Sequence, residues 1–135
     1  MKENPYLGVT LKDNLHWSSQ INNISKKASQ QLGFIRRNLR HCNQHFKETA
    51  YIVLVCSLLE YSCTVWDPHL QHEIQQIEAI QRKAARFVKA DYSRYSSVSQ
   101  MMAELGWKPL HTRRREQRLT MMFKIINNLV AIPPN

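Results

Sequence analysis

The residues that most often carry catalysis occur in this chain without the spacing that catalysis needs. No two of the 10 acidic residues stand as Asp-Asp or Asp-x-Asp, an arrangement that could hold two metal ions for phosphoryl transfer. The chain has only 3 glycines, and it contains no GxSxG turn, catalytic cysteine signature or phosphate-binding glycine loop. We therefore expect no active site and no cofactor in this chain.

Histidine and cysteine come closest together at His41, Cys42 and His45. These residues lie where the chain leaves a predicted helix, and no second pair of ligands follows at a spacing known for zinc. The cysteines at 42, 56 and 63 form no CxxC pair, which is typical of reduced, packing thiols. We expect no metal site. With no apolar signal segment at the N-terminus, we expect an intracellular protein, cytoplasmic or nuclear.

The distribution of basic residues is the feature that indicates a function. The 135 residues include 19 Lys and Arg against 10 Asp and Glu, giving a net charge of +9 and a pI near 9.8. A field of this sign favours polyanions, either nucleic acid or an acidic membrane surface. The alternative is a solvated basic surface with no partner. The predicted nucleic-acid-binding residues are Lys26 and Lys27, a first cluster of Arg36, Arg37 and Arg40, a second of Arg82, Lys83, Arg86 and Lys89, and a third of Arg113, Arg114, Arg115 and Arg118.

Each basic cluster lies on a predicted helix whose other face is apolar. If the helices bring these ends together, the cations form a stripe for RNA or DNA phosphates, with affinity that depends on salt and hardly on sequence. Cations near a helix C-terminus also complement the helix dipole, which is a purely structural explanation for the first cluster. Tyr92, Tyr95 and Trp107 follow the second cluster and could stack on bases, although packing within the protein is the commoner role.

Apolar periodicity predicts the helices that position these clusters. Residues 18–40, 70–88 and 110–129 form long amphipathic helices, and a shorter one over 98–105 ends at Gly106, the residue type favoured just past a helix end. The predicted inward positions are Ile21, Ile24, Ala28, Leu32, Ile35 and Leu39, then Leu70, Ile74, Ile77, Ala84 and Phe87 or Val88, and last Leu119, Met122, Phe123, Ile126 and Leu129.

The most apolar stretch of the chain runs from Tyr51 to Pro68 and predicts a central helix over about 45–61. Residues 52–59 leave no helical stripe for water, which is typical of a helix buried on all sides. The stretch is far shorter than the roughly 20 residues that cross a membrane, so no membrane partner is expected. Glu60 at its end needs a cationic or hydrogen-bonding partner, and we expect a structural ion pair. The residues whose loss should cost most are Leu54, Leu58 and Val65.

Residues 5–15 alternate weakly and predict one short strand followed by a turn. Since the rest of the chain is helical, this strand has no expected partner and either pairs with something outside the chain or lies as extended coil. The sequence predicts an all-α fold, a bundle of four or five helices preceded by a short extended or strand arm. We expect the arm over residues 1–15, a helical domain over 16–132 and a tail over 133–135.

Several stretches together resemble a known family. The segments YLGVTL, LHWSSQINNISKKA, LVCSLLEYSCTVWDP, IEAIQRKAARFV and ELGWKPLHTRRREQRL are similar to the C-terminal part of the reverse transcriptase of animal non-LTR retrotransposons, the jockey and CR-type LINE group. The resemblance runs from Tyr6 to Pro133 in the family's order. Its most specific part is LEY-x-x-x-VWDP followed by the IQRKAARF helix.

The resemblance implies a helical thumb-like domain of an RNA-directed DNA polymerase. Tyr6, Leu7, Gly8 and Val9 would match the last strand region of the palm, near the grip on the primer end. The basic helices would follow the backbone of a template–primer duplex or hybrid. The upstream palm of the reverse transcriptase would be the partner in the intact element, where it would pair with the lone strand.

The family's polymerase aspartates belong to a motif upstream of YLGV, and this chain begins five residues before Tyr6. The resemblance therefore implies a non-catalytic fragment of a polymerase and no enzyme in this chain alone. The alternative from another class is a helical protein-interaction module whose basic faces meet an acidic partner, which should show shape-specific hot spots.

Overall fold

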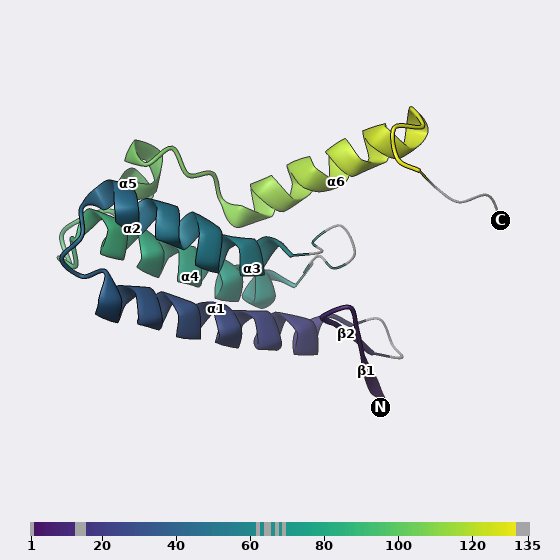
Figure 1. The fold of residues 1–135 in the computed structure, drawn as a ribbon, viewed down its shortest axis with the longest axis horizontal. Coiled ribbons are helices and arrows are strands. Elements are labelled where there is room, and N and C mark those ends of the chain that lie inside the picture. The colour runs from purple at the N-terminus through teal and green to yellow at the C-terminus, as the bar shows by residue number, and fades with distance from the viewer. Residues whose placement is uncertain are drawn as a thin grey trace.

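The computed structural model describes residues 2–12, 16–61, 63, 66, 68 and 70–131. Helices dominate the described chain, and a two-stranded sheet stands at its N-terminal end (Figure 1). This architecture confirms the predicted fold class, a helical bundle preceded by a short strand arm. Val65, the turn predicted after the strand at residues 13–15 and the predicted tail lie outside the described residues.

The N-terminal arm is a β-hairpin. Strand β1 (Glu3–Tyr6) pairs antiparallel with β2 (Val9–Lys12). Leu7 and Gly8 form the turn with φ of 47° and 81°, the positive values that favoured two-residue hairpin turns adopt. The prediction of a strand without a partner was therefore wrong, because the partner precedes it in the chain. The sequence ENPY of β1 does not predict a strand, since Asn and Pro are rare in strands.

Polar contacts fix the hairpin to the first helix, α1 (Ser18–Asn38). The Thr10 N–H donates to Gln20 Oε1 over 2.7 Å, and Ser19 Oγ donates to Glu3 Oε1 over 2.6 Å. A two-stranded hairpin alone is marginally stable at best in water. The contacts with α1 therefore hold the arm against the bundle.

Helices α1 and α4 (Gln71–Lys89) run side by side in the same direction (Figure 1). Ser18 Oγ donates to Glu73 Oε1 over 2.6 Å, and Gln76 Nε2 donates to Asn22 Oδ1 over 3.1 Å. Both hydrogen bonds join residues near the N-terminal ends of the two helices. Because the helices are parallel, their C-terminal ends also meet.

The buried positions of α1 and α4 follow the predicted helical stripes, with Leu70 as an exception. Leu70 precedes the first turn of α4 and is exposed, since a residue at that boundary no longer shares the helix face. Leu39 and Ile74 are half-buried. The predicted inward positions that are confirmed as buried are Ile21, Ile24, Ala28, Leu32, Ile35, Ile77, Ala84, Phe87 and Val88.

The predicted central helix forms as three continuous segments that run against α1 and α4. They are α2 (Gln44–Tyr51), one π-helical turn η1 (Ile52–Cys56) and α3 (Ser57–Glu60). Val55 and Leu59 are fully buried, and Tyr51 is 1% exposed. These inward side chains face α1 and α4 and complete the core.

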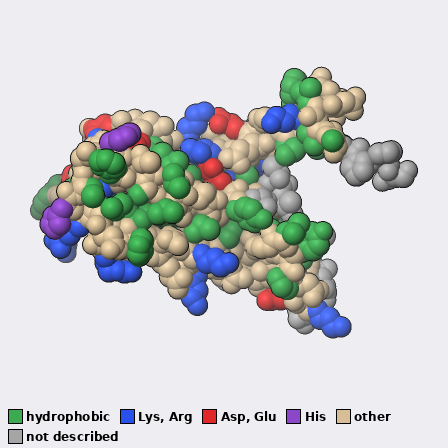
Figure 2. Space-filling model, viewed as in Figure 1, with side chains coloured by type: hydrophobic (Ala, Val, Ile, Leu, Met, Phe, Trp, Pro, Cys, Tyr) green, Lys and Arg blue, Asp and Glu red, His purple; other side chains and the backbone are tan. Residues whose placement is uncertain are grey.

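The central segment is buried on one side only. Ile52, Val53 and Leu54 are 49%, 60% and 40% exposed, so the prediction of a helix apolar and buried all round was wrong. Leu58 is half-buried, and the costly positions predicted at Leu54 and Leu58 belong instead to Val55 and Leu59. No described element covers the outer face, and Figure 2 shows hydrophobic side chains gathered on the surface over these segments.

The last two helices are α5 (Val98–Glu104) and α6 (Leu110–Ile126). Gly106 ends the α5 turn with φ of 71°, as predicted. Leu110 is fully buried, but the second half of α6 extends away from the bundle (Figure 1). The predicted inward stripe of α6 was therefore wrong, because no described element lies beside it. Its exposed residues are Leu119, Met122, Phe123, Ile126 and, just past the helix, Leu129.

Candidate nucleic-acid interface

The first basic cluster lies at the C-terminal end of α1. Arg36 and Arg37 occupy the last turn, and Arg40 follows the helix. Ile35 is fully buried, so the helical period turns the next two positions outward, and all three arginines are exposed. Figure 2 shows basic side chains gathered at this end of α1.

The end of α4 meets the first cluster because α1 and α4 are parallel. The Arg36 guanidinium carbon lies 5.8 Å from the centre of the Tyr92 ring, just after α4. Lys47, in the first turn of α2, places its Nζ 5.0 Å from the centre of the Phe87 ring in the last turn of α4. These helix ends enclose a groove of about 810 Å³, which we call the cationic groove. It is lined by Gly33, Arg36, Arg37, Arg40, Lys47, Phe87, Ala90 and Tyr92.

Lys47 is the groove residue that the sequence analysis missed. It lines the cationic groove and yet is only 6% exposed. Lys47, Tyr51 and Val55 follow one another at spacings of four, which places them on one helix face, and all three are buried. That spacing was the available signal, because a basic residue in line with a buried stripe turns inward.

No carboxylate lines the cationic groove within the described part of the chain. Its basic side chains share one space, and like charges held close together repel. An anion between them would relieve that repulsion. Part of the arrangement also serves the fold, since Arg36 and Arg37 complement the negative end of the α1 dipole.

Two members of the second basic cluster support the fold. Arg86 donates from its guanidinium to three backbone carbonyls of the loop at residues 91–96, at 3.1 to 3.4 Å. Lys89 Nζ lies 3.0 Å from Glu104 Oε2 of α5. Neither side chain is directed at the cationic groove. The exposed members of this cluster are Arg82 and Lys83.

The third basic cluster lies at the other end of the bundle. Arg113 donates from Nε and Nη2 to the Glu60 carboxylate, and Gln117 Nε2 donates to the same carboxylate over 3.2 Å. The ion pair predicted for Glu60 is confirmed. About 20 Å of helix separates Glu60 from Lys47 in the cationic groove, so the three clusters do not converge.

Arg114 is inside the protein. Its side chain is fully buried, and burial lowers the pKa of its guanidinium. The prediction that Arg114 contacts phosphate is not compatible with this burial. The hydrogen bond to Glu60 raises the pKa of Arg113 and commits that side chain to the fold. Arg115 is exposed and Arg118 is half-buried.

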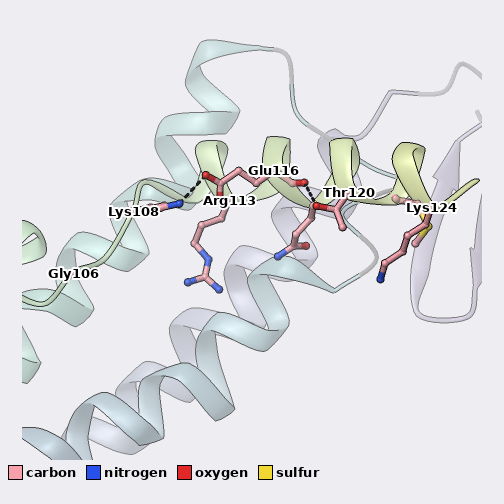
Figure 3. A pocket seen from close by; sticks show the side chains of 8 residues that line it. Gly106, Lys108, Arg113, Glu116, Thr120 and Lys124 are labelled. Atoms are coloured by element: carbon pink, nitrogen blue, oxygen red, sulfur yellow. Dashed lines mark hydrogen bonds and ion pairs between the residues drawn. The ribbon is translucent and has the colours of Figure 1, made fainter. Parts of the chain in front are cut away.

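A second groove, of about 600 Å³, follows α6 near the third cluster (Figure 3). Lys108 Nζ lies 2.8 Å from Glu116 Oε1 there, and Arg113 turns toward Glu60. Because these charges are paired within the protein, this groove is less suited to phosphate than the cationic groove. It is lined by Gly106, Lys108, Arg113, Glu116, Gln117, Thr120, Met121 and Lys124.

The remaining predicted residues lie away from the cationic groove. Lys26 and Lys27 are exposed on α1, more than two turns before Arg36. Residues 6–9 form the tip of the hairpin, which contacts α1 at Gln20. From Gln20 to Arg36 the helix rises about 24 Å. A small ligand in the cationic groove would therefore contact neither set.

Two of the three predicted stacking candidates remain on the surface. Trp107 stacks on Tyr51 with 4.5 Å between ring centres, and its Nε1 donates to Glu48 Oε1 over 2.9 Å. The packing role considered for Trp107 is thus confirmed. Tyr92 and Tyr95 are exposed, and Tyr92 lines the cationic groove.

The described residues hold no group of three His, Cys, Asp or Glu side chains placed to bind a metal ion. None of the helices formed by these residues has the length and hydropathy of a membrane-spanning segment. Comparisons of the chain with protein-family models, curated proteins and solved structures found no match. A functional assignment therefore rests on the geometry of the cationic groove and on the resemblance of the sequence.

Proposed function

We propose that the chain is a non-catalytic module that binds the backbone of RNA or DNA. One observation carries the proposal: parallel α1 and α4, with the start of α2, bring basic side chains into the cationic groove, where the described lining holds no competing carboxylate. Contacts with phosphate carry no sequence information. Binding is therefore expected to be independent of sequence and to weaken with salt.

The resemblance to non-LTR retrotransposon reverse transcriptases gives this proposal its biological setting. A helical bundle behind a strand arm is compatible with the thumb-like region that the resemblance implies. In an intact polymerase the module would stand beside the palm, inside the cell, and follow a template–primer duplex. The hairpin tip at residues 6–9 lies about 24 Å along α1 from the groove, so the two could contact one duplex at separate phosphates.

Fluorescence anisotropy with a labelled RNA–DNA hybrid tests the proposal. We expect a dissociation constant of roughly 10⁻⁴ to 10⁻⁶ M near physiological salt, and tighter binding at lower salt. A peptide nucleic acid duplex of the same sequence is the matched control, because its backbone is uncharged, and it should not bind. Absence of binding to the hybrid at low salt would refute the proposal.

The exposed half of α6 favours a second candidate, a helical protein-interaction module. Leu119, Phe123 and Ile126 are 58%, 60% and 71% exposed on one helix, and a contiguous apolar surface of this kind often marks an interaction site. The two candidate functions predict that affinity depends on different properties of the ligand and of the chain. Nucleic-acid binding should increase with phosphate number, whereas a protein partner should lose affinity when Leu119 and Phe123 are changed to Gln.

A further inference from the structure

The side chain of Lys47 is largely buried, and no described residue forms an ion pair with it. It is 6% exposed, and its Nζ faces the Phe87 ring at 5.0 Å. The described residues place no carboxylate in the groove that it lines. A ring face offers a cation only partial compensation for lost water, so a buried ammonium is expected to have an anion beside it. The basic lining of the groove therefore favours a negatively charged ligand.

The side chains around Lys47 set the chemistry of that group. Arg36, Arg37 and Arg40 line the same groove and are exposed. Guanidinium groups bind phosphate oxygens through paired N–H donors, and an ammonium acts as a compact point charge. This combination suits a phosphate group with several free oxygens.

Depth distinguishes two kinds of phosphate. An internal phosphodiester carries one negative charge and is flanked by a sugar on each side. On a duplex surface, the sugars keep it out of a narrow groove, and it contacts exposed arginines instead. A terminal phosphate monoester carries roughly −1.5 to −2 charges at pH 7, has three free oxygens and can enter a groove end-on. A side chain as enclosed as Lys47, which is 6% exposed, therefore suits the terminal group better than an internal phosphodiester.

We propose that the cationic groove is a receptor for the terminal phosphate of a nucleic-acid strand. Lys47 and the first-cluster arginines hold the monoester, and Tyr92, which is 57% exposed on the groove wall, stacks on the terminal base. This inference rests on the proposed function, because it takes nucleic acid as the ligand and specifies which part of the strand is bound.

Competition between matched oligonucleotides tests the inference. One single-stranded sequence is prepared with a 5′-phosphate, with a 3′-phosphate or with hydroxyl groups at both ends, and each form competes with a labelled strand for the full chain. We expect one phosphorylated end to bind about tenfold more tightly than the hydroxyl form. The two phosphorylated forms show which end is recognised.

Substitution of Lys47 tests whether the preference for a phosphorylated strand end arises in the cationic groove. Lys47→Met keeps the side-chain stem and removes the charge, so the preference for the phosphorylated end should disappear. Lys124→Met removes the same charge from α6, away from the cationic groove, and should keep the preference. Thermal unfolding and circular dichroism verify that both variants are folded. If Lys47→Met does not fold, Tyr92→Ala serves instead, and it should lower the preference for a phosphorylated end.

The outcomes separate this inference from the proposed function. Equal affinity for the phosphorylated and hydroxyl forms would overturn the terminal-phosphate site and leave backbone binding standing. A preference that survives in Lys47→Met as fully as in Lys124→Met would also overturn it. No binding to any strand would refute the proposed function and this inference together.

Discussion

Arg113, Arg114 and Arg115 are neighbours in the sequence and have three different environments. The first pairs with Glu60, the second is fully buried, and the third is exposed. Successive helical positions are turned by about 100°, so a run of arginines distributes itself around the helix. The sequence could not tell which arginine faces inward, because the contact of α6 with Glu60 is set by tertiary packing.

Ionisation of the Cys56 thiol is expected to lower the unfolding free energy at alkaline pH. Burial, with a contribution from the Glu60 charge, raises the pKa of this thiol from 9.0 to about 11. Because this pKa is raised in the folded state, burial of the neutral Cys56 thiol contributes fully to stability below pH 9. This contribution is lost as the pH rises through about 11. The unfolding free energy should fall by about 2–3 kcal/mol over this range.

Urea unfolding between pH 7.5 and 11 checks this expectation. Cys56→Ala should flatten the alkaline decline, although not remove it, because burial also raises the pKa of Tyr51. Cys42→Ala is the control, since Cys42 is only half-buried and should leave the slope unchanged. A decline of the same slope in Cys56→Ala would contradict the assignment.

Two leucines in the central segment test which side of it is buried. Leu59 is fully buried and Leu54 is 40% exposed. Leu59→Ala should lower the unfolding free energy by about 2–5 kcal/mol, whereas Leu54→Ala should cost about 1 kcal/mol or less. Chemical denaturation measures both. Equal costs would mean that another surface covers Leu54.

At the scale of elements, the start of α6 depends on a carboxylate from α4. Pro109 provides no side-chain cap; instead Glu78 accepts from the Leu110 N–H over 3.1 Å and from the His111 N–H over 2.8 Å. A capping carboxylate also complements the positive end of the helix dipole. Glu78→Ala should therefore cost about 1–2 kcal/mol.

Amide hydrogen exchange follows this effect directly. In Glu78→Ala the first turn of α6 should exchange faster, while α1 keeps its protection. Glu104→Ala serves as the matched control, because it removes an exposed carboxylate that pairs with Lys89 and lies outside α6. Unchanged exchange at Leu110 and His111 in Glu78→Ala would show that the cap does not hold the helix.

The positions of the long helices could be predicted from the periodicity of apolar residues. Which of their apolar faces other elements cover could not be predicted. The predicted spans 18–40 and 70–88 correspond to Ser18–Asn38 and Gln71–Lys89. The spacing of apolar residues states which face is apolar, but it does not state whether another element covers that face. For this reason the stripe of α6 and the outer side of residues 52–54 were placed inside and are exposed. The hairpin was missed because β1 lacks an alternating pattern.

At the scale of the molecule, the direction of α1 relative to α4 creates the cationic groove. Hydrogen bonds join the N-terminal ends of the two parallel helices, and their C-terminal ends meet around Arg36 and Tyr92. The sequence predicted the first basic cluster correctly as an exposed helix end. The spacing of Lys47 with Tyr51 and Val55 indicated that its side chain turns inward, but its position beside Phe87 depends on the packing of α2 on α4, which the sequence does not show.

The salt dependence of binding to an RNA–DNA hybrid tests the central claim most directly. Two charge-matched variants are compared with the unchanged chain: Arg36→Gln, Arg37→Gln and Arg40→Gln in the groove, and Lys108→Gln, Arg115→Gln and Lys124→Gln along α6 and the segment before it. Each phosphate contact contributes about 0.9 to the slope of log affinity against log salt. We predict that the groove variant lowers this slope by about 2–3 and the α6 variant by less than about 1. Equal slopes in the two variants would contradict the account, because binding would then follow net charge and not the cationic groove.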